Sequence, residues 1–167
     1  IPSPTSFTWA NQKAAMTPES NGFIYIAAIA NHLSTGVHLI VTKVNTSGSV
    51  DATFGTNGYA SFLLTSAPAS SQQLRGIVLG PGGRLVVGIN QPFQGRLVTF
   101  TLAGALDTTF GVGGITNFPN VTLNGLTGSS TSLTVFGSHS VQNLGKEAWD
   151  RSLTPTGSIA QTPWFPS

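Results

Sequence analysis

GSVDATFGTNG, at residues 48–58, recurs without a gap as GALDTTFGVGG, at residues 104–114. Six of the eleven aligned residues are identical, and the two copies start 56 residues apart. Self-similarity at such a spacing is the signature of a repeat protein, in which one structural unit packs on the next. We therefore expect residues 1–167 to form a single repeat domain.

A third, decayed copy of the unit runs from residues 132–137 through residues 154–159. In this copy Ala160 stands where the first two copies have Asp, and Pro163-Trp164 stands in place of Phe-Gly. Terminal repeats are commonly atypical because they cap the stack. The approximate units are 16–60, 61–116 and 117–167, and residues 1–15 form an N-terminal tail.

Short apolar runs of alternating character fill each unit, for example residues 59–64, 74–79, 85–89 and 97–102, and Gly, Pro, Asn and Ser separate them. Alternation with a period of two is typical of antiparallel β-strands. About four such runs per unit predict an all-β fold of about three four-stranded antiparallel units that resemble propeller blades. A β-prism or a sandwich is the alternative.

The repeated motif has a structural interpretation. A turn Asp accepts hydrogen bonds from backbone N–H groups two residues on, and a Phe that follows packs between neighbouring units. Glycines supply positive φ or allow a close approach of two backbones. The residues concerned are Asp51, Phe54, Gly55 and Gly58 in the first copy and Asp107, Phe110, Gly111 and Gly114 in the second.

The motif, with PGGRLVVG ahead of it at residues 81–88, resembles the delta-60 repeat family. Units of that family follow one another in large bacterial surface and secreted proteins. The resemblance covers residues 21–114 well and residues 126–164 weakly. It implies a propeller-like β fold and a surface context, and it brings no catalytic residues.

The number of units bears on assembly. Closed propellers usually have about four to eight blades, so the chain is a fragment of a longer array, or copies associate to close six or more units, or the units form another three-part β arrangement. An unclosed stack leaves strand edges exposed to pairing. We therefore expect self-association or attachment to other subunits of a surface assembly.

Charge and composition exclude several partners. Charged residues make up 7% of the chain, the net charge is +2, and Lys and Arg do not cluster; nucleic-acid binding needs a concentrated basic stripe. No stretch approaches the roughly 18 apolar residues of a membrane span. There is no Cys, and the start at Ile1 lacks an initiator Met, as in a processed or excised piece. Asn45 and Asn120 open two glycosylation sequons.

Catalytic and metal chemistry lack candidates. The chain has five acidic residues, and Asp51 and Asp107 occupy equivalent positions in successive units, too far apart for a carboxylate pair. His32, His38 and His139 show no metal-ligand spacing, and no Gly-x-Ser-x-Gly turn occurs. We expect no catalytic residues, no metal site and no cofactor.

One charged segment invites a binding interpretation. Trp149, Asp150 and Arg151 combine an aromatic ring with both signs of charge, as in sugar-stacking or protein-contact sites; an ordinary strand with alternating charges is the competing interpretation. The sequence thus predicts a non-enzymatic structural or adhesive module of an extracellular, cell-surface or virion-surface assembly. A lectin-like module that binds glycans is the alternative.

Overall fold

The computed structural model describes residues 6–65, 72–141 and 145–159. In this part of the chain, all regular structure is β. The strands form three antiparallel sheets in chain order, so that each sheet is a meander of sequential hairpins. The all-β prediction is therefore confirmed.

Each sheet corresponds to one repeat unit. The first holds β1 (Phe7–Pro18), β2 (Ile24–His32), β3 (Gly36–Val44) and β4 (Tyr59–Thr65). The second holds β5 (Gln73–Gly80), β6 (Arg84–Gln91), β7 (Gln94–Thr101) and β8 (Ile115–Pro119). The third holds β9 (Val121–Gly128), β10 (Leu133–Val141) and β11 (Gly145–Leu153), with β10 in the middle.

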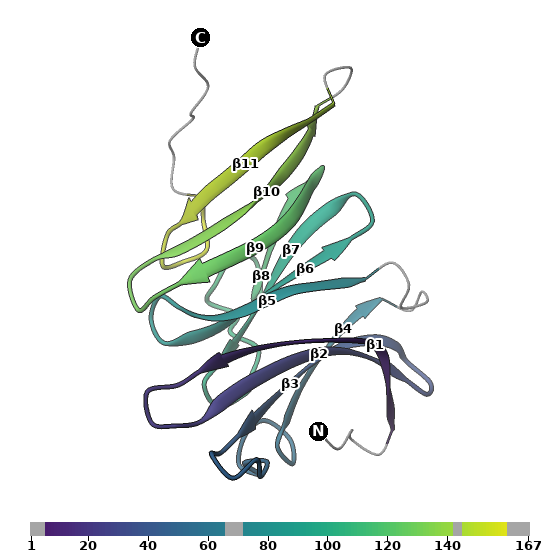
Figure 1. Cartoon of the computed structure of the whole chain (residues 1–167), viewed down its shortest axis with the longest axis vertical. Helices are drawn as coiled ribbons and strands as arrows, with labels where there is room; N and C mark the ends of the chain where they lie inside the picture. Colours follow the sequence, from purple (N-terminus) through teal and green to yellow (C-terminus); the bar gives the residue numbers. More distant parts are fainter. Residues whose placement is uncertain (1–5, 66–71, 142–144, 160–167) are drawn as a thin grey trace.

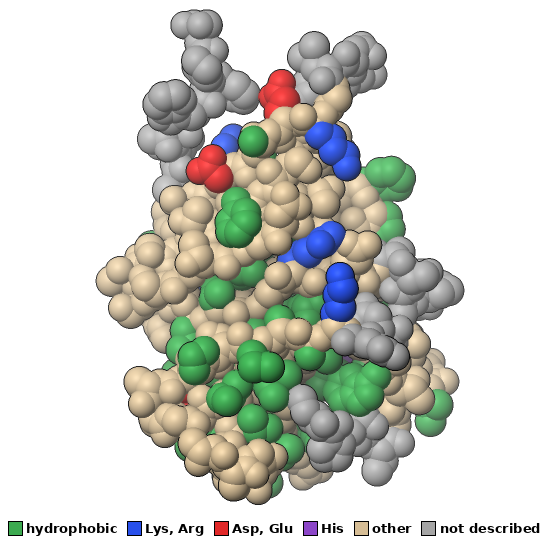
Figure 2. All heavy atoms as spheres, in the orientation of Figure 1, with side chains coloured by type: hydrophobic (Ala, Val, Ile, Leu, Met, Phe, Trp, Pro, Cys, Tyr) green, Lys and Arg blue, Asp and Glu red, His purple; other side chains and the backbone are tan. Residues whose placement is uncertain are grey.

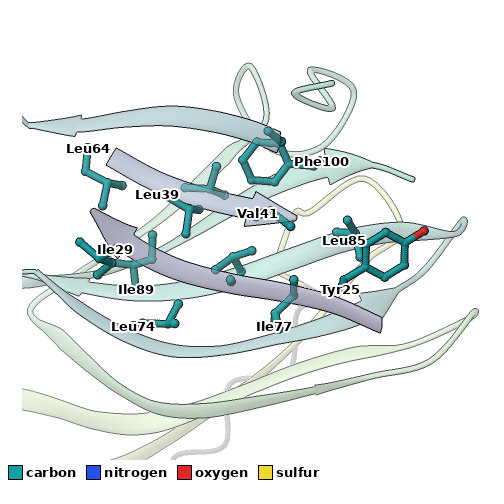
Figure 3. Close-up of a cluster of buried hydrophobic side chains, with 14 of the residues drawn as sticks. Tyr25, Ile29, Leu39, Val41, Leu64, Leu74, Ile77, Leu85, Ile89 and Phe100 are labelled. Carbon is teal, nitrogen blue, oxygen red and sulfur yellow. The ribbon is translucent and has the colours of Figure 1, made fainter. Parts of the chain in front are cut away.

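The sheets are stacked face to face, with the second between the other two (Figure 1). A first hydrophobic core lies between the first and second sheets, and Figure 3 shows its side chains, among them Tyr25, Leu39, Leu85 and Phe100. A second core, with Leu97, Phe110, Leu123 and Leu133 among its members, lies between the second and third sheets.

The middle sheet explains an uninterrupted apolar run in the sequence. Leu85, Val87 and Ile89 face the first core, whereas Val86 faces the second, and all four are fully buried. A strand that is covered on both faces needs apolar residues at successive positions. Burial of both faces also defines the second sheet as the centre of the stack.

Three sequence predictions need correction. Residues 1–15 are not simply a tail, because Phe7–Pro18 forms β1 and pairs with β2. The sheets span residues 7–65, 73–119 and 121–153 rather than the predicted units 16–60, 61–116 and 117–167. Among the described residues the third sheet has three strands, not four, and no sheet closes on itself.

Candidate functional site

The motif forms the same turn in the first two units. Asp51 Oδ1 accepts hydrogen bonds from the Thr53 backbone N–H and hydroxyl, at 3.0 and 2.6 Å. Asp107 accepts the same two bonds from Thr109, at 3.1 and 2.5 Å. The Thr53 hydroxyl, and then its N–H, lower the pKa of Asp51 below its usual value. This is the turn that the sequence predicts for the motif.

The rings that follow are buried. Phe54 and Phe110 are 1% and 0% exposed, and they belong to the first and second cores respectively. The Gly58 N–H closes the first turn on the Phe54 carbonyl at 2.9 Å, and Gly114 does the same with Phe110. Each ring therefore enters the space between its own sheet and the next.

The residue after each ring joins its sheet to the next one. The Gly55 N–H donates to the Ala103 carbonyl at 2.8 Å, and the Gly111 N–H donates to the Thr156 carbonyl at 2.7 Å. Both contacts cross from one repeat unit to the following unit. We call each of them a Phe-Gly joint, and we call the turns that receive them, residues 101–105 and 154–158, acceptor turns.

Glycine in the acceptor turn allows this close approach. A Cβ on Gly104 would lie 2.6 Å from the Gly55 nitrogen and 3.1 Å from Phe54 Cζ. A Cβ on Gly157 would lie 2.6 Å from two ring carbons of Phe110. Real Cβ atoms do not approach other atoms so closely, so each joint requires glycine at this position.

The first unit contains a third acceptor turn, residues 45–49. In the turn at 101–105, the Thr101 N–H donates to the Ala105 carbonyl at 2.8 Å, and the Ala105 N–H donates to Thr101 Oγ1 at 3.2 Å. In the turn at 45–49, Asn45 and Ser49 make the same two bonds, with Asn45 Oδ1 as the side-chain acceptor, both at 2.9 Å. In the turn at 154–158, Thr154 and Ser158 make these two bonds at 2.8 and 3.1 Å, so the three turns share one local structure.

The surroundings of the first acceptor turn differ. Gly48 has φ +80°, close to +87° at Gly104 and +81° at Gly157, but it is exposed whereas the other two are buried. A Cβ on Gly48 would meet no atom within 4 Å. Among the described residues, no backbone N–H donates to the carbonyl of Ser47. This acceptor turn thus receives no Phe-Gly joint from the described chain.

Arg84 strengthens the second joint. Its Nη1 donates to the Pro155 carbonyl at 2.9 Å, in the acceptor turn of the third unit. Its Nε lies 3.2 Å from Asp107 Oδ2, with the two side chains 14% and 10% exposed, and its guanidinium lies 5.2 Å from the Phe110 ring centre. One side chain therefore links the motif of the second unit to the turn of the third.

A separate pocket of about 270 Å³ lies where β8 and β11 approach each other. The Trp149 ring packs edge-on against Phe118, with the ring centres 5.1 Å apart. The Arg151 guanidinium lies 5.4 Å from the Trp149 ring centre. The lining residues are Asn117, Phe118, Pro119, Val121, His139, Glu147, Ala148, Trp149, Arg151 and Ile159.

The structure does not bring the three predicted binding residues together. Trp149 and Arg151 line the pocket, but Asp150 does not; it is exposed and pairs across the sheet with Phe136. Successive residues of a strand point to opposite faces, so Glu147 rather than Asp150 shares the face of Trp149. Strand alternation in the sequence would have indicated Glu147 as a neighbour of Trp149. No such signal indicates Phe118, because it belongs to another sheet.

Other candidates are dispersed. The described residues contain no group of three or more His, Cys, Asp or Glu side chains that could hold a metal ion. No helix in this part of the chain is long and apolar enough to cross a membrane. Asn45 lies in the first acceptor turn, and Asn120 is exposed between β8 and β9.

Comparison with known proteins found no match among family models, curated proteins or solved structures. The resemblance to the delta-60 repeats therefore rests on the repeated residues themselves. The function has to be inferred from the geometry of the joints and of the pocket.

Proposed function

We propose that the chain is a non-enzymatic structural or adhesive module of an extracellular, cell-surface or virion-surface assembly, and that it works by contact with other subunits. The observation that carries this proposal is the repeated Phe-Gly joint. The motif that dominates the sequence joins one unit to the next in two places, and its two Phe rings are buried there.

The first sheet supports the proposal because its outward face is apolar. Met16 is 65% exposed and Leu63 is 48% exposed, and Ile24 and Ile26 are half-buried. Figure 2 shows hydrophobic side chains gathered over β1 and β2. Large exposed apolar side chains on one face are typical of an interaction site, and a chain with 7% charged residues has little repulsion to keep copies apart.

Light scattering over a range of concentrations tests this proposal. The isolated chain should show an average mass above 17.3 kDa that rises with concentration, because the apolar face of the first sheet finds another copy when no other subunit is present. Met16→Lys with Leu63→Lys should restore the monomer, whereas Phe93→Lys, at a residue that is 90% exposed elsewhere, should not. A monomer at every concentration, with no partner found by crosslinking in the native source, would contradict the proposal.

Glycan binding at the pocket is a second candidate function. The Phe118–Trp149 pair beside Asn117, Glu147 and Arg151 combines aromatic and polar groups, as sites for polar ligands with apolar faces do. A glycan array should then give signals that Trp149→Ala removes. Asp150→Ala is the matched control, because Asp150 faces away from the pocket. Signals that survive Trp149→Ala would exclude this pocket as the glycan site.

A further inference from the structure

The outward face of the first sheet is equivalent, strand by strand, to a face that is buried in the second sheet. Ile26 pairs with Met16 on one side and with Thr42 on the other. Val87 pairs in the same way with Ile77 and Val98. Ile26 and Met16 therefore hold, in the first sheet, the positions that Val87 and Ile77 hold in the second.

β3 and β7, the strands that lead into the acceptor turns of the first and second units, are equivalent in the same way. Ile24 pairs with Val44, and Leu85 pairs with Phe100. Val44 then bridges to Val50 across the first acceptor turn, as Phe100 bridges to Leu106 across the second. The apolar face and the acceptor turn are thus parts of one continuous surface in both units.

The two equivalent surfaces differ in what covers them. In the second sheet, Ile77 is 4% exposed and Val87 is 0% exposed, because the first unit lies on them. In the first sheet, Met16 is 65% exposed. The start of β1 covers the far part of the face, where the Phe7 ring lies 5.2 Å from His38, and Thr42 and Val44 on β3 are 3% and 7% exposed. The open part lies on β1 and β2, at Met16, Ile24 and Ile26.

We infer that this surface is the docking site for a further repeat unit that carries an Asp-x-Thr-Phe-Gly turn. The Phe of that unit would pack over the face of Met16 and Ile24, and the N–H of the following Gly would donate to the Ser47 carbonyl. The occupant follows from the chain itself, because Phe54-Gly55 and Phe110-Gly111 fill the two equivalent sites. This inference rests on the proposed function as a module of an assembly, and it names the chemistry of the partner.

A second copy of the chain does not supply such a unit. The rings of its two described Phe-Gly pairs, Phe54 and Phe110, are already buried in its own cores. The N–H groups of the two glycines already donate to its own acceptor turns. The outward face of its third sheet is mixed: Phe136, which is 44% exposed, lies beside Asp150 and near the hydroxyls of Thr134 and Ser152, which are 3.4 Å apart. The described residues of a second copy therefore offer no unoccupied Asp-x-Thr-Phe-Gly turn to the first sheet.

The methyl group of Met16 gives a direct readout, because the chain contains one Met. A four-unit chain, with residues 73–119 added ahead of residue 1, carries a complete extra unit and adds no Met. Docking should protect the Met16 methyl several-fold from a soluble paramagnetic agent in NMR. The control carries Phe110→Ser and Gly111→Val in the added copy alone, and its Met16 should be as accessible as in the three-unit chain.

A peptide of residues 105–116 provides a second measurement that does not depend on folding of the added unit. At millimolar concentration it should shift the Met16 methyl and Gly48 amide signals of the three-unit chain, and the Phe110→Ser peptide should not. The inference is overturned if neither the added unit nor the peptide moves these signals. It is also overturned if a second copy protects Met16 and the added unit does not displace that copy.

These outcomes are distinct from failure of the proposed function. A three-unit chain that stays monomeric would contradict the self-association expected above, but Met16 would still report docking of the added unit. Conversely, the three-unit chain could self-associate while Met16 stays accessible in the four-unit chain. That result would support the role in an assembly and would contradict this docking site.

Discussion

Single side chains decide how the sheets meet. Phe54 and Phe110 enter the two cores from turns that Asp51 and Asp107 hold in shape. Each ring approaches a glycine of the next unit more closely than any side chain would permit. Each joint therefore depends on one ring and on the glycine opposite it.

Truncation of one ring should be costly. Phe110→Ala removes a fully buried ring and should lower the free energy of unfolding by about 3–5 kcal/mol. Urea denaturation followed by fluorescence measures this loss. Phe93→Ala, at a residue that is 90% exposed, should change it by at most about 0.5 kcal/mol. Equal effects of the two substitutions would show that the ring does not hold the sheets together.

Acid should weaken the first unit through His38. Its ring nitrogens lie 2.8 Å from Thr35 Oγ1 and 2.8 Å from Ser61 Oγ. Burial, and secondarily the nearby His32, lower the pKa of His38 below its usual value of 6.5. Above pH 6.5 His38 is neutral in both the folded and the unfolded chain, and it does not change the free energy of unfolding. As the pH falls below 6.5, the unfolded chain takes up a proton at His38 before the folded chain does, so the free energy of unfolding decreases until the pH has passed the lower pKa of the folded chain.

The thermal midpoint measured between pH 7.5 and 5 tests this pH dependence. His38→Gln should flatten the decline, because the variant has no group to titrate at this position. An unchanged decline in the variant would assign the pH dependence to other groups.

At the scale of elements, alternation predicted the strands that are buried. Residues 59–64, 74–79 and 85–89 fall within β4, β5 and β6, and residues 97–102 overlap β7 except for the last residue, because a strand that faces a core must place apolar residues at fixed intervals. β1 was missed. It is an edge strand with Lys13 exposed, and its pairing with β2 rather than an apolar pattern of its own holds it in place.

The joints were only partly predictable. From the sequence repeat we could predict that Phe54 and Phe110 are equivalent and buried. The repeat shows only which residues are equivalent to one another, and it does not show which residues they contact. Contact between the first motif and Gly104, or between Phe118 and Trp149, depends on how whole sheets pack. The grouping of Asp150 with Trp149 has another cause: the two are adjacent in the sequence, and strand alternation, which was not applied to them, places them on opposite faces.

Arg84 should act across the second joint. Arg84→Leu removes the cation that faces the nearly buried Asp107 and the bond to the Pro155 carbonyl. Its cost should exceed that of the same change made in an Asp107→Asn background, with a coupling energy of about 0.5–3 kcal/mol. A double-mutant cycle by urea denaturation gives this value. Strictly additive effects would show that Arg84 and Asp107 do not interact.

At the scale of the whole molecule, stability comes from two hydrophobic layers between three sheets. The described residues offer no cluster of acidic or His side chains for a structural ion. Thermal stability should therefore not change on addition of EDTA, since removal of a structural metal would remove folding energy. A fall of several degrees that calcium restores would show that the chain depends on a bound ion.

We expect the Phe-Gly joints to hold the units together, whereas no described residue docks on the first acceptor turn. Gly48→Ala, Gly104→Ala and Gly157→Ala test it most directly, because the three glycines have φ of +80°, +87° and +81°. Backbone strain of about 1–2 kcal/mol is then common to all three variants. Gly104→Ala and Gly157→Ala should lower the free energy of unfolding in urea by about 1–3 kcal/mol more than Gly48→Ala does, because their Cβ atoms collide with the joints. Equal losses at all three positions would contradict it.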